Sequence, residues 1–185
     1  MSLIAALLLL SGPGFDLDPA YKPVKDPLAP SRAGKFQCHE PDTAARTCRI
    51  MAWFSEGANG AVQVRQLTAI SDSPALAAEL RMGITREGPA FCGVVNDAYM
   101  AGFRIVSSRA PYPAADNKRY AILYRQAMIE ALWNRKACSY AYARPDDPRL
   151  LEVGTVDGQF AGELMSNYIW IDAAAGYRLK ARPPA

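Results

Sequence analysis

The sequence has few of the features that would point directly to a function. It contains a single histidine among 185 residues, and no apolar run approaches the roughly 20 residues that a membrane-spanning helix needs. The serine-nucleophile motif Gly-x-Ser-x-Gly, the phosphate-binding loop and the redox motif Cys-x-x-Cys are all missing. These absences argue against common classes of hydrolase, nucleotide-binding protein and disulfide oxidoreductase. We expect no cofactor and no stable membrane insertion.

The charge distribution argues against a nucleic-acid partner. The formal net charge is +3, from 21 basic and 18 acidic residues. The two signs are interleaved, and the densest basic pairs, Lys118 with Arg119 and Arg135 with Lys136, fall inside one predicted helix. Binding to nucleic acid needs a basic stripe or groove that follows the phosphates. We therefore expect no nucleic-acid partner.

The first residues have the pattern of an export signal. Residues 3–10 form an unbroken apolar octet, and small or turn-forming residues follow at positions 11–14. This arrangement is typical of the apolar region and cleavage region of a secretory signal, so the sequence predicts a signal peptide over residues 1–14. No Lys or Arg precedes the octet. A hydrophobic N-terminal helix packed on the domain therefore remains the alternative.

The next segment, residues 15–34, is rich in proline. Four prolines alternate there with charged residues, namely Pro19, Pro23, Pro27 and Pro30. Proline fixes φ and removes a backbone donor, so neither a helix nor a central strand forms readily. The segment is interpreted as an extended, mobile leader. Residues 35–185 then form a single domain, which is large enough to fold around its own core.

The cysteine content predicts cross-links. Cys38, Cys48, Cys92 and Cys138 are an even number behind a predicted export signal, which favours two disulfides in an oxidising compartment. Three pairings are possible, and we prefer Cys38–Cys48 with Cys92–Cys138, because the first is local and spans a turn. In the chain-entropy model, closing these two loops stabilises the fold by about 2.7 and about 4 kcal/mol.

The same region gives no metal site and no catalytic residue. The closest cysteines are ten positions apart, and His39 adjoins Cys38. Adjacent strand residues point to opposite faces, so this pair chelates a metal poorly. Because Cys38 is expected to be oxidised and a turn follows, we interpret His39 as a surface residue and not as a general base.

Most of the domain has the pattern of β-strands. Residues 50–55 and 61–70 predict a hairpin around a glycine-bearing turn. Residues 75–84 combine a helix-like start with strict alternation of apolar and polar side chains, and we favour a strand because periodicity reports burial. Further strands are predicted over residues 90–95, 101–107, 138–143, 150–156, 168–172 and 177–181.

One long helix is predicted between these strands. Over about 118–136 the apolar residues recur with the spacing of a single helical face. They are Tyr120, Leu123, Tyr124, Ala127, Met128, Ala131 and Leu132. The fold class is therefore predicted as α+β, a mainly antiparallel sheet with this helix packed on one face.

Two groups of side chains are candidates for binding or chemistry. Glu152 and Glu163 could support glycoside hydrolysis if the fold brought them together. Four aromatic residues near the C-terminus could form a stacking surface for a sugar or peptide, and core packing is their alternative role. They are Tyr140, Tyr142, Tyr168 and Trp170.

Short stretches of the chain resemble a family of small secreted proteins of alphaproteobacteria. They are Gln-Cys-His-Glu-Pro-Asp at 37–42, Arg-Thr-Cys at 46–48, Val-Asp-Gly at 156–158, Trp-Ile at 170–171 and Gly-Tyr at 176–177. Members of that family have no characterised activity. The resemblance implies export and a disulfide-linked domain, and it implies no reaction.

Two functional hypotheses follow from these patterns. The first is a non-enzymatic domain in the periplasm or outside the cell, which binds a protein, a glycan or another envelope component, with an inhibitor as one form. The alternative is a small envelope hydrolase that uses carboxylates.

Overall fold

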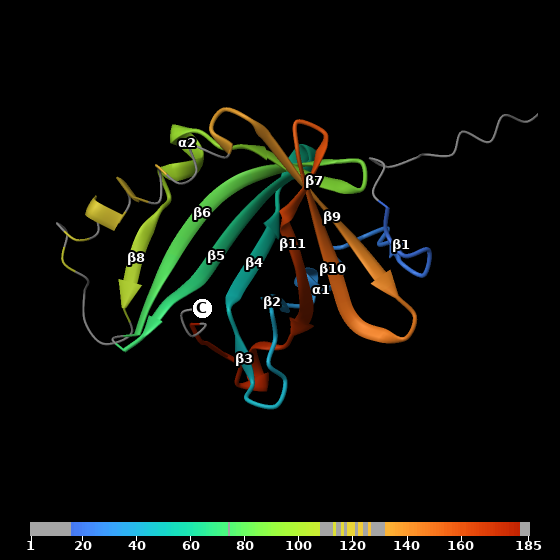
Figure 1. Ribbon diagram of the computed structural model, residues 1–185, viewed down its shortest axis with the longest axis horizontal. Helices are drawn as coiled ribbons and strands as arrows, with labels where there is room; N and C mark the ends of the chain where they lie inside the picture. Colours follow the sequence, from blue (N-terminus) through green and yellow to red (C-terminus); the bar gives the residue numbers. More distant parts are fainter. Residues whose placement is uncertain are drawn as a thin grey trace, which may run out of the picture.

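The computed structural model describes residues 16–73, 75–107, 113, 116, 118–120, 122–123, 126 and 132–181 (Figure 1). Its main feature is a closed antiparallel β-barrel of eight strands. Around the barrel the strand order is β9-β10-β11-β2-β4-β5-β6-β7, and β7 pairs with β9 to close the ring. The strands are β2 (Phe36–His39), β4 (Ile50–Glu56), β5 (Ala61–Asp72), β6 (Ala75–Glu87), β7 (Ala90–Val94), β9 (Lys136–Arg144), β10 (Asp147–Val156) and β11 (Gln159–Ile171).

Short elements decorate the barrel. Strand β1 (Lys22–Pro23) pairs with β9, and β8 (Arg104–Ser107) pairs with β6. Strands β3 (Thr47–Cys48) and β12 (Arg178–Leu179) form a separate parallel pair. Within the continuously described ranges 16–73, 75–107 and 133–181 the helices are α1 (Ala29–Arg32) and α2 (Asp97–Met100), with single 3-10 turns η1 (Ala58–Gly60) and η2 (Ala173–Ala175). No helix in the described part of the chain is long and apolar enough to cross a bilayer.

The α+β prediction is wrong. In the described ranges no helix reaches seven residues, and the fold is mostly β-barrel. Within the predicted helix 118–136, residues 118–120, 122–123, 126 and 132 are helical, and residues 121, 124–125 and 127–131 lie outside the described residues. The last residue of the prediction, Lys136, is instead the first residue of β9 and pairs with Val94 of β7. A sheet that closes on itself covers its own apolar face, so the barrel needs no helical layer.

The strand predictions that rest on alternation are confirmed. The predicted hairpin is β4 with β5, and the ambiguous segment 75–84 is part of β6. In β6 the apolar Leu80 and Met82 belong to the barrel's inner cluster, whereas Arg81 between them is exposed. This is the pattern expected when one face of a strand is buried and the other meets water.

Apolar side chains are buried in two layers. The inner cluster fills part of the barrel and consists of Leu28, Ala52, Val62, Val64, Leu80 and Met82. The outer cluster is partly covered by η2 and β12 and consists of Phe36, Cys38, Cys48, Met51 and Ile171. Strand β2 therefore has buried residues on both faces, and all four of its side chains are buried.

The proline-rich segment contributes to the folded barrel. Leu28, immediately before α1, is only 1% exposed and packs in the inner cluster. Lys22 and Pro23 pair with Ala143 and Tyr142 of β9. Residues 16–34 thus include docked elements as well as extended chain, while the predicted signal peptide, residues 1–14, lies outside the described residues.

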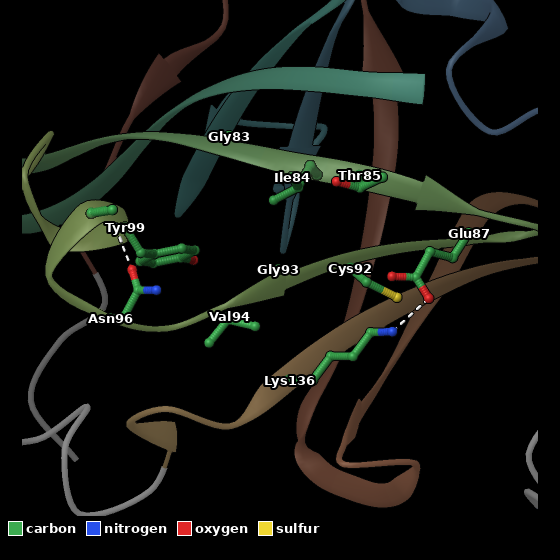
Figure 2. A pocket seen from close by; sticks show the side chains of 11 residues that line it. Gly83, Ile84, Thr85, Glu87, Cys92, Gly93, Val94, Asn96, Tyr99 and Lys136 are labelled. Atoms are coloured by element: carbon green, nitrogen blue, oxygen red, sulfur yellow. Dashed lines mark hydrogen bonds and ion pairs between the residues drawn. The ribbon is translucent and has the colours of Figure 1, made fainter. Parts of the chain in front are cut away.

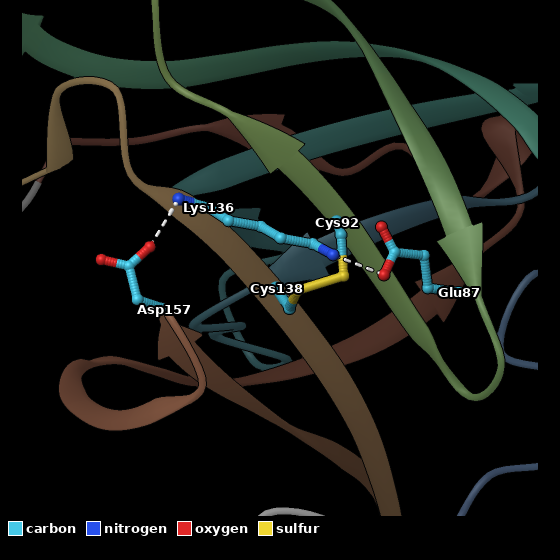
Figure 3. Close-up of a disulfide and its surroundings, with 5 residues drawn as sticks. All are labelled: Glu87, Cys92, Lys136, Cys138 and Asp157. Atoms are coloured by element: carbon cyan, nitrogen blue, oxygen red, sulfur yellow. Dashed lines mark hydrogen bonds and ion pairs between the residues drawn. A yellow bond between two sulfur atoms is a disulfide. The ribbon is translucent and has the colours of Figure 1, made fainter.

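Both predicted disulfides are present. Cys38–Cys48 joins β2 to β3, and Cys92–Cys138 joins β7 to β9 (Figure 3). Cys92 and Cys138 stand opposite each other in the register of the pair of strands that closes the barrel. The second bridge is therefore a covalent link across the closing seam, which we define as the β7–β9 pairing.

A candidate ligand cavity inside the barrel

A cavity of about 430 Å³ lies inside the barrel. All eight barrel strands contribute to its wall, and Pro27 and Leu28 line it next to α1. Barrels of eight strands are just wide enough either to be filled by side chains or to hold one small ligand. The volume falls in the range of small-molecule sites, so the interior is the first candidate for a functional site.

One side of this cavity is apolar. Strands β4, β5, β6 and β7 contribute Ala52, Phe54, Val64, Met82, Ile84 and Phe91 to its lining. On β9 the neighbouring positions carry the small residues Ala137, Ser139 and Ala141, which leave the space open. An apolar molecule placed here would exchange water for contact with carbon atoms, which is favourable.

The opposite side carries a polar network, which we define as Gln37, His39, Glu152 and Ser166. His39 Nδ1 lies 2.9 Å from Ser166 Oγ and 3.5 Å from Glu152 Oε2. Its Nε2 lies 3.0 Å from Gln37 Oε1. Ser166 Oγ lies 3.3 Å from Glu152 Oε2. These residues come from β2, β10 and β11, three neighbouring strands.

Register explains why these side chains meet. Tyr168 of β11 pairs with His39 of β2, and the two rings stack with centroids 5.2 Å apart. Ser166 precedes Tyr168 by two residues, so it faces the same side of β11, and it pairs with Glu152 of β10. Burial raises the pKa of the Tyr168 hydroxyl, so the ring remains a neutral neighbour.

The electrostatics of His39 follow from its burial. Burial lowers the pKa of His39, against the weaker opposing effect of the carboxylates Glu152 and Glu40. The imidazole is therefore neutral near pH 7, and Gln37 Oε1 beside Nε2 favours the tautomer that is protonated on Nε2. Nδ1 is then an acceptor. The Ser166 hydroxyl has one proton but two acceptors within reach, Nδ1 and Glu152 Oε2.

A bulge in β11 shapes the cavity. The register passes from Glu152 opposite Ser166 to Gly154 opposite Ala161, so residues 162–165 stand opposite Val153 alone. The extra residues bring Glu163, Leu164 and Met165 to the cavity lining. Leu164 packs directly on Gly154, where an added Cβ would lie 2.3 Å from the Cβ of Leu164.

Replacing Gly154 by alanine is therefore expected to destabilise the barrel by about 2 kcal/mol, the usual cost of overpacking. The β11 bulge must move, because the obstructing atom is the Cβ of Leu164. Urea unfolding measures the loss. Gly162→Ala is the matched control, because a Cβ there meets only the Phe160 ring at 3.5 Å. Equal stability of the two variants would contradict this account of the bulge.

The two predicted carboxylates meet at the cavity, whereas the four predicted aromatic residues do not form one surface. Glu152 and Glu163 both line the cavity, so the fold brings them to one site. Tyr140 and Tyr168 also line it, but Tyr168 is only 1% exposed. Tyr142 and Trp170 are not part of the described lining. The four aromatic residues lie on β9 and β11, which β10 separates, and they do not form one exposed face.

The interpretation of His39 as a surface residue is wrong, because it is 7% exposed and faces the cavity. Sequence reasoning also missed Gln37 and Ser166. The available signal was the alternation of Gln37 and His39 with Phe36 and Cys38, which marks a strand with two distinct faces. Among the described residues, no cluster of three or more His, Cys, Asp or Glu could hold a metal ion.

A second hollow, of about 400 Å³, lies beside β6, β7 and α2 (Figure 2). Three of its polar side chains, Glu87, Asn96 and Lys136, already have partners. Lys136 Nζ contacts Glu87 Oε2 at 2.5 Å, and Asn96 Oδ1 accepts a hydrogen bond from the Tyr99 backbone at 3.0 Å. The barrel cavity combines an apolar wall with a convergent polar group, which is the more usual form of a ligand site.

Comparison with protein-family models, with curated proteins and with solved structures finds no match to this chain. The function is therefore inferred from the fold and the cavity.

Proposed function

We propose that this protein is an exported binding protein that holds one small amphipathic molecule inside its barrel. The observation that carries the proposal is the cavity of about 430 Å³ with an apolar wall facing a polar network. Its two disulfides support a location in an oxidising compartment, the periplasm or the cell exterior. Within the hypothesis of a protein that binds an envelope component, the ligand is therefore a molecule with a polar and an apolar part.

The geometry of the polar network favours binding over serine-type catalysis. In a Ser–His–acid triad the nucleophile and the carboxylate bond to different ring nitrogens, so that the histidine can pass a proton between them. Here Ser166 and Glu152 both lie next to Nδ1, and Nε2 faces an amide oxygen. This arrangement orders polar groups at a cavity wall and lacks the relay of a triad, because among the described residues no carboxylate lies at the ring nitrogen that faces away from the serine.

A direct binding measurement tests the proposal. The fluorescence of N-phenyl-1-naphthylamine, an uncharged apolar dye, is expected to rise when it enters the cavity, and decanol should displace it. Ala141→Phe fills space beside β9 and should weaken dye binding at least about tenfold, equivalent to 1.4 kcal/mol. Tyr142→Phe, on the same strand but outside the lining, should leave binding unchanged.

Both variants must first unfold at a denaturant concentration close to that of the parent protein, which separates cavity filling from misfolding. If the folded parent protein gave no dye enhancement, or if Ala141→Phe bound the dye as well as the parent, the proposal would be refuted.

A second candidate is a carboxylate-dependent hydrolase, because Glu152 and Glu163 line the same cavity. Inverting and retaining glycosidases both place two carboxylates on either side of the scissile bond. Turnover of peptidoglycan or chitooligosaccharide that is lost in both Glu152→Gln and Glu163→Gln would support it. No turnover by the parent protein would reject it.

A further inference from the structure

The charge inside the barrel is unbalanced. Among the described residues that line the cavity, the ionisable side chains outside the tyrosines are Glu40, Arg49, His39, Glu152 and Glu163. Arg49 Nη1 pairs with Glu40 Oε1 at 3.1 Å, and His39 is neutral because of its burial. Glu152 and Glu163 remain as two negative charges without a cationic partner in this lining.

A bound cation would stabilise Glu152 more than Glu163, because Glu152 is less exposed to water. Its side chain is only 28% exposed, whereas Glu163 belongs to the exposed residues of β11. A carboxylate that has lost part of its hydration needs donors or a positive charge to offset that loss. The polar network supplies one hydroxyl proton, which Glu152 Oε2 shares with His39 Nδ1.

The acceptors of this network converge. Glu152 Oε2, His39 Nδ1 and Ser166 Oγ lie within 3.5 Å of one another, and each can accept a hydrogen bond. A primary ammonium group has a positive charge and three N–H donors, which matches three acceptors of which one is a carboxylate oxygen. A carboxylate head would instead face Glu152 with a like charge and without donors.

From these contacts we propose that the ligand's polar part is a protonated primary amine that pairs with Glu152 and donates to His39 Nδ1 or Ser166. Its apolar part lies along the wall formed by β4, β5, β6 and β7. This inference rests on the proposed function and specifies the chemical class of molecule that the cavity takes.

Three ligands of equal chain length test it at pH 7, namely decylamine, decanol and decanoate, each displacing N-phenyl-1-naphthylamine. Decylamine is expected to displace the dye at a concentration about tenfold lower than decanol, and decanoate should be the weakest. In Glu152→Gln the amine should lose this preference, so that decylamine and decanol displace the dye at concentrations within about twofold of each other. In Glu163→Gln the preference should shrink less, because exposed charges are screened by water.

Asp172→Asn is the control for net charge, because it removes one negative charge from a side chain that is 64% exposed and outside the lining. It should retain the full preference for decylamine. Equal displacement by all three ligands, a preference for decanoate, or an amine preference that survives Glu152→Gln would overturn the amine assignment and leave the binding function standing. A folded protein that binds neither the dye nor any of the three would overturn both.

Discussion

Replacing Cys92 and Cys138 together by alanine is expected to lower the free energy of unfolding by about 4 kcal/mol. The bridge closes a loop with a sequence separation of 46, so the unfolded chain gains much conformational freedom when it is removed. In the folded state the same bridge lies at the centre of the closing seam, which comprises the register pairs from Ala90–Tyr140 to Val94–Lys136.

The non-covalent contacts beside this bridge are too weak to replace it. The ion pair between Lys136 and Glu87 is 47% exposed on both sides, and such pairs contribute about 0–1 kcal/mol (Figure 3). Asp157 Oδ1 accepts a hydrogen bond from the Lys136 backbone at 2.9 Å, which ties β9 to the β10–β11 turn but not to β7. The seam therefore depends on strand pairing once the disulfide is absent.

The second bridge is the natural control. Alanine at Cys38 and Cys48 opens a loop with a sequence separation of only 10, so the expected loss is smaller, about 2.7 kcal/mol. Urea unfolding of both double variants gives the comparison, and amide hydrogen exchange should show faster opening of β7 and β9 only in the first. Equal losses, or a larger loss from the short loop, would show that loop length does not determine the stabilisation here.

The strands could be predicted from the sequence because alternation is a local property. Val62 and Val64 in β5, and Leu80 and Met82 in β6, repeat with a period of two and bury one face. The disulfide pairing could also be predicted, because Cys48 is the cysteine nearest to Cys38 and a turn between them lets the two sulfurs meet. These features depend on neighbours within a few residues, or on counting cysteines.

Barrel closure could not be predicted in the same way. Periodicity shows which face of a strand is apolar, but it does not show what covers that face. Here β7 pairs with β9 across an intervening stretch that includes all but the last residue of the predicted helix 118–136. A helix laid on an open sheet and a sheet closed on itself give similar strand patterns, so the wrong fold class followed from a sound local observation.

The candidate site depended on register even more strongly. Glu152 and Glu163 were singled out by residue type alone, and only the β10–β11 pairing and the bulge at residues 162–165 place both at the cavity. His39 was assigned to the surface because it adjoins a cysteine and a turn. In fact β2 is covered on both faces, so the position next to a buried Cys38 is buried as well.

The outer face of the barrel carries the other feature with a large expected effect, a carboxylate surrounded by arginines. The Glu79 side chain of β6 is 0% exposed, and it pairs with Arg65 at 2.6 Å, with Arg81 at 3.1 Å and with Arg104. Arg65 and Arg81 stand directly opposite each other in the β5–β6 register, where like charges destabilise a sheet. Glu79 offsets that repulsion.

Glu79→Gln is therefore expected to lower the free energy of unfolding at pH 7 by about 3 kcal/mol, because three guanidinium groups lose their shared charged acceptor. Glu87→Gln, which breaks only the exposed pair with Lys136, should cost less than about 1 kcal/mol. Urea unfolding of the two variants beside the parent protein measures both changes. A Glu79→Gln loss no larger than that of Glu87→Gln would mean that the arginines are held apart by other contacts.

The same carboxylate predicts how stability depends on pH. Burial alone would raise the pKa of Glu79, but hydrogen bonds from Arg104, Arg65 and Arg81 outweigh it and lower the pKa from 4.5 to about 2. Since the folded pKa lies below the unfolded one, this stabilisation is complete above about pH 4.5 and is lost as the pH falls towards 2. The difference in free energy of unfolding between the parent protein and Glu79→Gln should therefore shrink progressively as the pH falls across that window. An advantage that stayed constant from pH 7 to pH 2.5 would assign the stabilisation to packing around Glu79 and not to its charge.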